Sequence, residues 1–243
     1  MPPQDYYSES GLILVDKPQD WTSHDVVNFV RGRFAISKVG HCGTLDPIAT
    51  GLLVLLLGRA TRLSSRLLSQ DKVYTGVLRL GVETHTQDRA GEITATADFG
   101  SVTSDAVRAA AARFVGSIMQ VPPMVSALKR DGQRLYKLAR RGQEVEREPR
   151  PVQIHRFDID TIDIPMVRFT VHCSKGTYIR TLCADLGKTL GCGGHMYDLR
   201  RLRSGSFRIE DAHTIETIKA WDRQTFMAQM TPLADVVVGL MDT

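Results

Sequence analysis

The chain has 243 residues, of which 42% are hydrophobic and 24% charged, so it can bury a core and global disorder is excluded. Its net charge of +4 is too small to identify a partner without knowing where the charges cluster. Residues 52–57, the longest apolar run, are too few to span a bilayer, and the N-terminus has no signal-peptide pattern. We therefore expect a soluble, cytoplasmic protein.

The first part of the chain predicts two buried strands with a helix between them. Residues 12–15 are apolar and end at an Asp-Lys-Pro sequence, which predicts a short strand. Thr22 or Ser23 can cap a helix whose apolar stripe is formed by Val26, Val27, Phe29 and Val30. The apolar run at residues 52–57 predicts a second strand that Gly58 ends.

The middle of the chain alternates between strand and helix patterns. Residues 72–84 alternate in polarity, which predicts a strand with one face made of Tyr74, Gly76, Leu78 and Leu80. A turn at residues 88–91 leads to another strand at residues 92–97. Thr103 or Ser104 then begins a helix that Gly116 is expected to end.

The last part predicts a strand, a helix and a basic segment. Residues 167–173 alternate, with an inward face formed by Val167, Phe169, Val171 and Cys173. A helix follows residues 174–176 and ends at Gly191, and the basic residues 196–209 lead into a strand. Strands outnumber helices and mix with them irregularly. This order predicts one α+β domain over residues 1–243, with a largely antiparallel central sheet flanked by helices and loops.

Residues 122–154 differ in composition from the rest of the chain. Prolines lie at both ends, and the segment contains a cluster of cations with a single acid, Asp131, among them: Lys129, Arg130, Arg134, Lys137, Arg140 and Arg141. Two interpretations are open: a solvated surface helix, or a basic arm that closes on phosphates. The glycines and prolines favour a loop whose order depends on its partner.

Several kinds of active site can be excluded from the sequence. The four cysteines form no C-x-x-C pair, so we expect reduced thiols. Zinc ligands usually come in closely spaced pairs, but His41 and Cys42 are direct neighbours that cannot readily share one metal, so we expect no metal. A catalytic Cys42 with His41 as its base is not favoured, because the base of such a pair normally comes from elsewhere in the fold. No glycine-rich nucleotide-binding motif is present, so a nucleotide cofactor has no support. One isolated acid, Asp46, remains between a Gly-Thr turn and the second strand. Arg180, at a helix start where a cation needs compensation, is a candidate partner.

Several motifs, in this order, resemble the TruB family of pseudouridine synthases. They are "DKPQDWTSHDVV", "KVGHCGTLDPIATGLLVLLLGRATRL", "KVYTGVLRLGVETHTQD", "PPMVSALKRDGQRLYKLARRG", "CSKGTYIRTLCADLG" and "LRRLRSGSF". The resemblance implies the pseudouridine synthase catalytic fold. It also implies that the chain isomerises a T-loop uridine, conventionally position 55, in transfer RNA without a cofactor. The expected partner is the T stem-loop, and we expect a monomer.

The resemblance also assigns roles to individual residues. Asp46 of "GTLDP" matches the catalytic aspartate, and Arg180 matches the arginine that pairs with it. The substrate side would be formed by Tyr74, which stacks on the target base, and Leu199, which lines the uracil pocket. His41 matches a histidine at the place from which the base has flipped, and Lys17 matches a lysine with a structural part. Residues 122–154 correspond to a loop that clamps the T arm.

Three alternatives stay open at this point. The motifs also occur in related synthases that work with guide RNAs. A transfer-RNA chaperone without catalysis is a second reading, and a thiol or zinc hydrolase using His41 and Cys42 is a third.

Many bacterial members of the TruB family carry a further C-terminal module of the PUA type, and no separate module of this kind is evident in the sequence.

Overall fold

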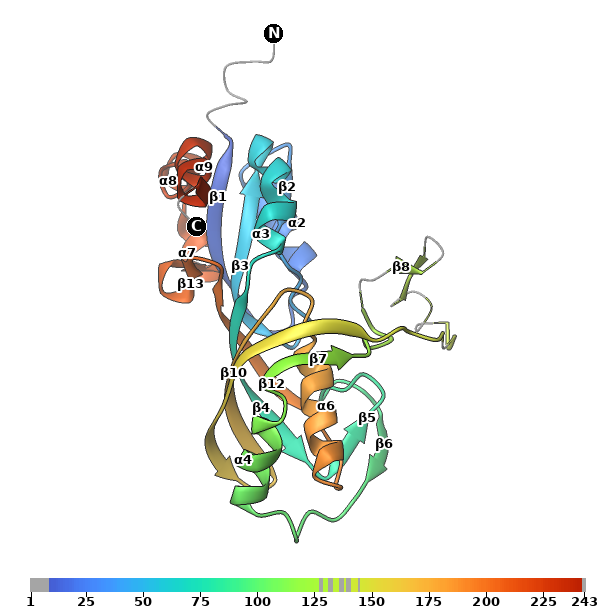
Figure 1. Cartoon of the computed structure of the whole chain (residues 1–243). Coiled ribbons are helices and arrows are strands. Elements are labelled where there is room, and N and C mark those ends of the chain that lie inside the picture. Colours follow the sequence, from blue (N-terminus) through green and yellow to red (C-terminus); the bar gives the residue numbers. More distant parts are fainter. Residues whose placement is uncertain are drawn as a thin grey trace. The chain divides into compact units, whose positions relative to one another are not determined.

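The computed structural model describes residues 9–126, 129–130, 133–135, 138, 141–143 and 145–241, and Figure 1 follows the chain through them. The chain divides into two units, one made of residues 1–73 and 200–243 and the other of residues 74–199. The boundaries fall inside two strands, β4 (Lys72–Leu80) and β12 (Gly194–Ser204). We describe each unit separately below.

The sheet of the first unit is built around β1 (Gly11–Lys17) and β3 (Thr50–Leu57), which pair antiparallel along their length. Strand β2 (Val39–His41) pairs antiparallel with β3. Arg200 and Arg201 of β12 pair parallel with Thr50 and Gly51 at the start of β3. Short strands complete the edges: β13 (Phe207–Arg208), β14 (His213–Thr214) and β15 (Thr231–Pro232). The helical segments are α2 (Ser23–Arg33), η1 (Gly58–Leu63), α3 (Ser64–Leu68), η2 (Ile209–Asp211), α7 (Ile215–Ala220), α8 (Arg223–Ala228) and α9 (Leu233–Met241).

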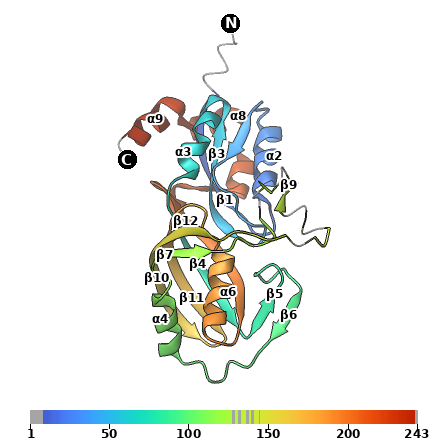
Figure 2. The same ribbon diagram turned by 45° about the vertical axis from the view of Figure 1, so that its right-hand side comes forward.

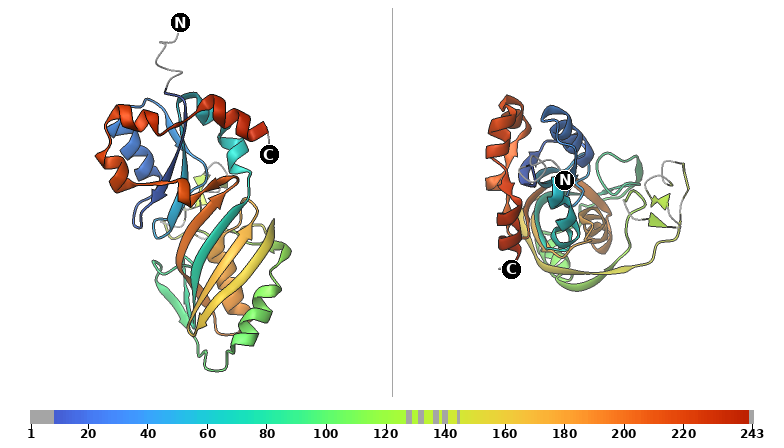
Figure 3. Two further views of the ribbon diagram at one scale, coloured as in Figure 1. Left: turned by 90° about the vertical axis from the view of Figure 1, so that its left-hand side faces the viewer. Right: turned by 90° about the horizontal axis from the view of Figure 1, so that it is seen from above.

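Strand β3 is buried on both faces, which explains its unbroken apolar sequence. On one face Leu53, Leu55 and Leu57 join the core that includes residues of α2, α7 and α8. On the other face Leu52, Val54 and Leu56 join a second core with residues of α3 and α9. The left view of Figure 3 shows α2 and the red C-terminal helices around these strands. The loop that precedes β3 is therefore anchored to a rigid, doubly covered strand.

The sheet of the second unit has the order β12, β4, β11, β10, β7. Its long hairpin is formed by β10 (Arg150–Asp163) and β11 (Met166–Cys173), and β7 (Gly116–Gln120) pairs antiparallel with β10. Helices α4 (Ser104–Ala112) and α6 (Ile179–Thr189) belong to this unit. Two small hairpins complete it: β5 (Val82–Thr84) with β6 (Ile93–Thr96), and β8 (Lys129–Arg130) with β9 (Gln133–Arg134). Figure 2 shows β9 set apart from this sheet.

The prediction of a mixed α+β fold with a largely antiparallel sheet is confirmed. The predicted helix start is also confirmed, because Thr22 caps α2 in a reciprocal capping box with Asp25. The inward face of β11 is as expected, with Val167, Phe169 and Val171 fully buried. The expectation of one domain over residues 1–243 stays a prediction.

Three local predictions were wrong. The strand expected over residues 72–84 is interrupted at Gly81, whose φ of +82° turns the chain. The helix expected to reach Gly116 ends at Ala112, and Gly116 instead opens β7 with a φ of +113°. The basic residues 196–209 lie mainly within a strand, β12, rather than leading into one, and β10 had no counterpart in the sequence analysis. No helix in the described ranges is long and apolar enough to cross a membrane.

Candidate active site

Asp46 lies half-buried in the loop between β2 and β3 of the first unit, and the residue before it is held on both backbone groups. The Ser23 hydroxyl accepts a hydrogen bond from the Leu45 N–H at 2.8 Å and donates one to the Leu45 carbonyl at 3.2 Å. Ser23 is the first residue of α2 and is 1% exposed. The start of this helix therefore fixes the backbone next to the predicted catalytic carboxylate.

Arg201, on β12, hydrogen-bonds to the chain on both sides of the Asp46 loop. Its side chain is 1% exposed and donates to the carbonyl of Leu52 at 2.7 Å and to that of Gly43 at 3.0 Å. Gly51 has a φ of +98°, and a Cβ there would lie 2.4 Å from the Arg201 carbonyl oxygen. Only glycine permits this close approach. The loop is thus held by a buried arginine from the segment that the sequence analysis described only as basic.

Lys17 is the second buried cation beside the loop, with an exposed fraction of 0%. Its Nζ donates to the carbonyls of Pro18 at 2.8 Å, Trp21 at 2.5 Å and Pro47 at 3.3 Å. Burial lowers the pKa of Lys17 to about 8, and the negative charge of Asp46 is the largest influence that opposes this shift. Lys17 therefore links the Asp46–Pro47 turn to the end of β1 and brings a positive charge to the carboxylate.

The pair His41 and Cys42 does not favour thiol chemistry. Cys42 is fully buried, and burial raises the pKa of its thiol to about 11. Burial, and then the charge of Arg201, lowers the pKa of His41, so its imidazole is neutral near pH 7. A protonated, buried thiol is a poor nucleophile, which counts against the hydrolase reading.

In the second unit, Arg180 is the second residue of α6 and 3% exposed. Its Nη1 donates to the Thr86 carbonyl at 2.9 Å, and its Nη2 donates to the Val125 carbonyl at 2.7 Å. Its Nε lies 3.8 Å from Oδ2 of Asp88. A cation at a helix N-terminus needs compensating charge, and within this unit Asp88 supplies it.

Asp88 was missed by the sequence analysis, although the motif that contains it was quoted. The Thr86 hydroxyl donates to its Oδ1 at 2.6 Å, and the Ala90 N–H donates to the same atom at 3.0 Å. The same turn reaches α6 again, because the Thr181 hydroxyl donates to Oε1 of Gln87 at 2.8 Å. The available signal was an acid in a tight turn after an alternating strand, but nothing in the spacing indicated Arg180 as its partner.

Tyr74 on β4 and Leu199 on β12 are both buried in the second unit, and the pocket that they are expected to share stays a prediction. They are 8% and 5% exposed. Gly76 follows Tyr74 on the same face of β4, and a Cβ there would lie 3.2 Å from Cδ1 of Leu199. The missing side chain at Gly76 therefore leaves the space that Leu199 fills.

Comparison with known proteins identifies the family. The model described as "TruB family pseudouridylate synthase (N terminal domain)" matches residues 31–179, and that of the "tRNA pseudouridylate synthase B C-terminal domain" matches residues 180–239. The chain belongs to the TruB family.

Among its relatives are proteins named tRNA pseudouridine synthase B. The one from Syntrophotalea carbinolica is 51% identical over 210 residues, which are 86% of this chain and 69% of that protein. The one from Opitutus terrae is 48% identical over 232 residues, which are 94% of this chain and 96% of that protein. In the crystal structure of a Cbf5-Nop10-Gar1 complex, one chain is 29% identical with a TM-score of 0.73. That match covers 96% of this chain and 63% of the solved one.

The site residues of this TruB chain fall into two groups. Lys17, His41 and Asp46 belong to the first unit, whereas Tyr74, Arg180 and Leu199 belong to the second. The ion pair expected between Asp46 and Arg180 therefore stays a prediction.

The basic arm is described only in part. Lys129, Arg130 and Arg134 lie on β8 and β9, and Arg141 is exposed. Lys137 and Arg140 lie outside the described residues. The function of the arm as an RNA clamp also stays a prediction.

Proposed function

We propose that this TruB-family protein is a tRNA pseudouridine synthase that isomerises a uridine of the T loop, at position 55, to pseudouridine. Relatives carrying the name tRNA pseudouridine synthase B share 46–51% identity over 86–96% of the chain. The observation that carries the proposal is the environment of Asp46. A half-buried carboxylate stands on a loop fixed by Ser23, Lys17 and Arg201, as a preorganised catalytic group requires.

The chemistry fits a single carboxylate without a cofactor. The reaction breaks the bond between ribose carbon 1′ and a ring nitrogen of uracil and forms a carbon–carbon bond to the same ring. The ionised Asp46 would attack carbon 1′, attack the uracil ring, or remove the 2′ proton on the way to a glycal. Each route needs the charged form of the acid, and the nearby ammonium of Lys17 favours that form.

The remaining residues receive roles around this acid. Arg180 would pair with Asp46, Tyr74 would stack on the target base, and Leu199 would line the uracil pocket. A stacked base cannot be reached by a catalytic group, so the uridine must leave its stack. His41, neutral because of its burial, would meet the RNA where the base had been.

The transfer RNA partner follows from the same reasoning. The arm at residues 122–154 would hold the T stem-loop through phosphate contacts. We further expect a monomeric enzyme that works in the cytoplasm and needs no metal.

The test is direct. The purified chain is incubated with a transfer RNA transcript that carries tritium at carbon 5 of uridine, because the isomerisation releases that hydrogen to water. Release of one tritium per RNA, mapped to the T loop by sequencing of the modified position, is the expected result. A transcript with cytidine at position 55 is the control. Release from that transcript, or none from the first, contradicts the proposal.

A guide-dependent synthase is the second candidate, because one chain of an H/ACA RNP bound to a substrate RNA has a similar fold with a TM-score of 0.69, as has one of the Cbf5-Nop10-Gar1 complex with 0.73. The latter chain's identity of 29% is lower than the 51% shared with a protein named tRNA pseudouridine synthase B, which favours the first candidate. Activity of the purified chain on a bare T stem-loop, with no guide RNA or partner protein, separates the two. Tight binding without isomerisation would instead support the chaperone reading.

A further inference from the structure

Gln120, the last residue of β7, is almost completely buried and holds the start of α6. It is 2% exposed. Its Oε1 accepts a hydrogen bond from the Tyr178 N–H at 2.7 Å, and its Nε2 donates to the Tyr178 carbonyl at 3.1 Å. Both ends of one amide side chain are therefore used on both backbone groups of one residue. Neither Glu nor Leu can reproduce this pair of contacts, because Glu at neutral pH has no donor and Leu has neither group.

Tyr178 is the N-cap residue of α6, and its own side chain does not cap the helix. Helix starts leave backbone N–H groups without an intrahelical acceptor. Gln120 supplies an acceptor from another strand, while the Tyr178 carbonyl also accepts the Leu182 N–H at 3.0 Å within the helix. The first turn of α6, and with it Arg180 two residues later, is thus aligned by a side chain that is distant in the sequence.

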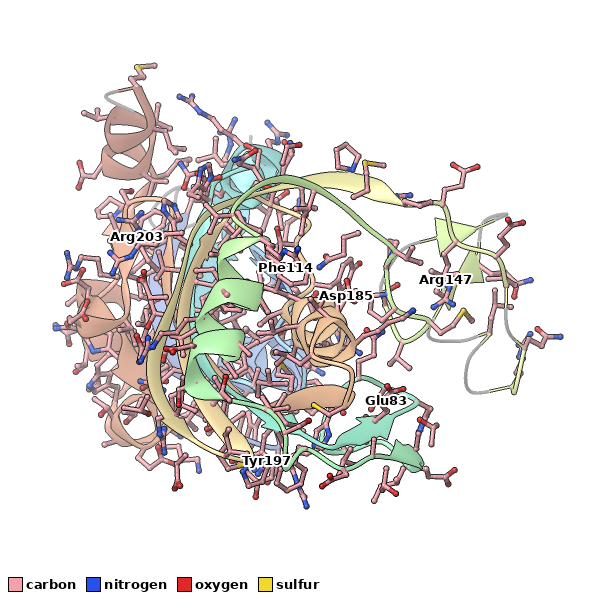
Figure 4. The ribbon with its side chains drawn as sticks, turned by 60° about the horizontal axis from the view of Figure 1, so that its bottom comes forward. Glu83, Phe114, Arg147, Asp185, Tyr197 and Arg203 are labelled. Atoms are coloured by element: carbon pink, nitrogen blue, oxygen red, sulfur yellow. The ribbon has the colours of Figure 1, made fainter. Side chains whose placement is uncertain are left out.

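Gln120 also lies where the chain leaves the sheet for the basic arm. Its ladder partner is Arg150, the first residue of β10, where the chain returns. These two segments form the root of the arm, and a second contact joins them: Arg147 donates to the Pro122 carbonyl at 3.3 Å. Figure 4 shows Arg147 on the returning segment. The departing segment then gives the Val125 carbonyl to Arg180 at 2.7 Å. The root of the arm and the arginine therefore share one hydrogen-bond network.

We propose that Gln120 is a positioning residue for Arg180, which aligns the guanidinium by joining the first turn of α6 to the root of the basic arm. The role in turnover rests on the proposed function, whereas the effect on Arg180 does not. Loss of Gln120 should move Arg180 without removing any cation that contacts RNA. The rate of isomerisation should fall while the affinity for RNA is retained.

The experiment uses the full chain with two substitutions of similar size. Gln120→Leu removes both hydrogen bonds. Gln120→Glu keeps an acceptor for the Tyr178 N–H, which a helix N-terminus favours, but sets an oxygen against the Tyr178 carbonyl. The control is Val107→Ala, a buried truncation on α4 that lowers stability and removes no hydrogen bond of the network, because valine has no polar side-chain group. The rate is measured in single turnover at saturating T stem-loop, and RNA affinity separately.

We expect Gln120→Leu to slow the reaction about 100-fold, as displaced catalytic groups do, with Gln120→Glu slowed less. The dissociation constant for RNA should remain close to that of the wild type in both variants. A normal rate in Gln120→Leu overturns the proposal. An equal loss of rate in Val107→Ala also overturns it, because general destabilisation would then suffice.

A second measurement needs no activity. In Gln120→Leu the Tyr178 amide should exchange faster with solvent, and the side-chain Nε–H resonance of Arg180 should shift in the protein without RNA. Neither should change in Val107→Ala. If the wild type makes no pseudouridine, the proposed function fails, and these two signals still decide on Gln120. An unchanged Arg180 resonance overturns its positioning role.

Discussion

Lys17 and Arg180 are both buried cations at the proposed site, but they are held in opposite ways. Lys17 donates to three backbone carbonyls, and two of these, Pro18 and Trp21, lie within four residues of it. Arg180 donates to the carbonyls of Thr86 and Val125, which are 94 and 55 residues away. Lys17 is therefore held mainly by its own turn, with one further contact to Pro47, whereas Arg180 is held by distant segments of its unit.

The difference has chemical consequences. A lysine ammonium is a compact charge that two carbonyls of its own turn and that of Pro47 can surround, and burial makes it easier to deprotonate. The guanidinium of Arg180 is a planar fork that divides its contacts between separate segments. Lys17 is thus suited to stabilise the Asp46 loop, whereas Arg180 responds to movement of the turn at residues 84–88 or of the arm root.

The largest effect should come from the acid that both cations are proposed to serve. Asp46→Asn keeps the size of the side chain and removes its charge, so we expect the rate to fall by roughly 10⁴-fold or more. RNA binding should stay within a few-fold of the wild type, because the phosphate contacts lie elsewhere. Tritium release and filter binding measure the two quantities. Turnover at the wild-type rate would remove Asp46 from the mechanism.

The next effect distinguishes the two ways of holding a cation. Arg180→Met should reduce the single-turnover rate about 100-fold, and Arg180→Lys should recover only part of it, because one ammonium cannot reproduce a fork aimed at two carbonyls. Complete recovery by lysine would show that charge alone matters. The exposed Arg113→Lys substitution on the segment after α4 serves as the control and should leave the rate unchanged.

Lys17 should instead affect stability in a pH-dependent way. Its pKa is lowered to about 8 in the folded protein, from 10.5 in the unfolded chain, so the unfolded chain binds the proton more tightly. The contribution of Lys17 to the free energy of unfolding should therefore rise as pH increases from about 8 to 10.5, and it should be constant below and above this range. The full gain is about 3 kcal/mol.

The comparison that isolates this effect is with Lys17→Met, which lacks the titrating group. The difference in unfolding free energy between the wild type and Lys17→Met, measured by urea denaturation at several pH values, should follow the expected rise. The exposed Lys38→Met variant is the control and should show no such difference. A flat difference for Lys17→Met would mean that the buried lysine titrates as it does in water.

The same contrast explains what the sequence could reveal. The Thr22 cap, the apolar run of β3 and the alternation in β11 depend on neighbouring residues, so their patterns predicted the elements correctly. Two of the three carbonyls around Lys17 are similarly local. Asp88 and Gln120 acquire their importance only when segments tens of residues apart meet at α6. No periodicity or capping rule specifies such meetings.

Arg201 shows that the charge of a side chain does not by itself predict its exposure. The three arginines in "LRRLRS" identified only a basic segment, yet the strand places Arg201 at 1% exposure. Its burial is offset by the carbonyls of Gly43 and Leu52, which a loop and a separate strand provide. Charge predicts exposure only when such acceptors are absent, and their presence is a property of the fold.

The smallest expected effect concerns the arm, whose charges should act on binding and not on the placement of Arg180. Arg140→Gln combined with Arg141→Gln should flatten the log–log dependence of RNA affinity on salt by about one to two units, at 0.7–0.9 per lost phosphate contact. The rate at saturating RNA should not change, in contrast to Arg180→Met. Arg31→Gln with Lys38→Gln removes the same charge from exposed positions outside the arm and should leave the slope unaltered. An unchanged slope in the arm variant would show that these arginines do not contact phosphates. A reduced rate at saturating RNA would show that the arm's charges, and not only its root, support Arg180.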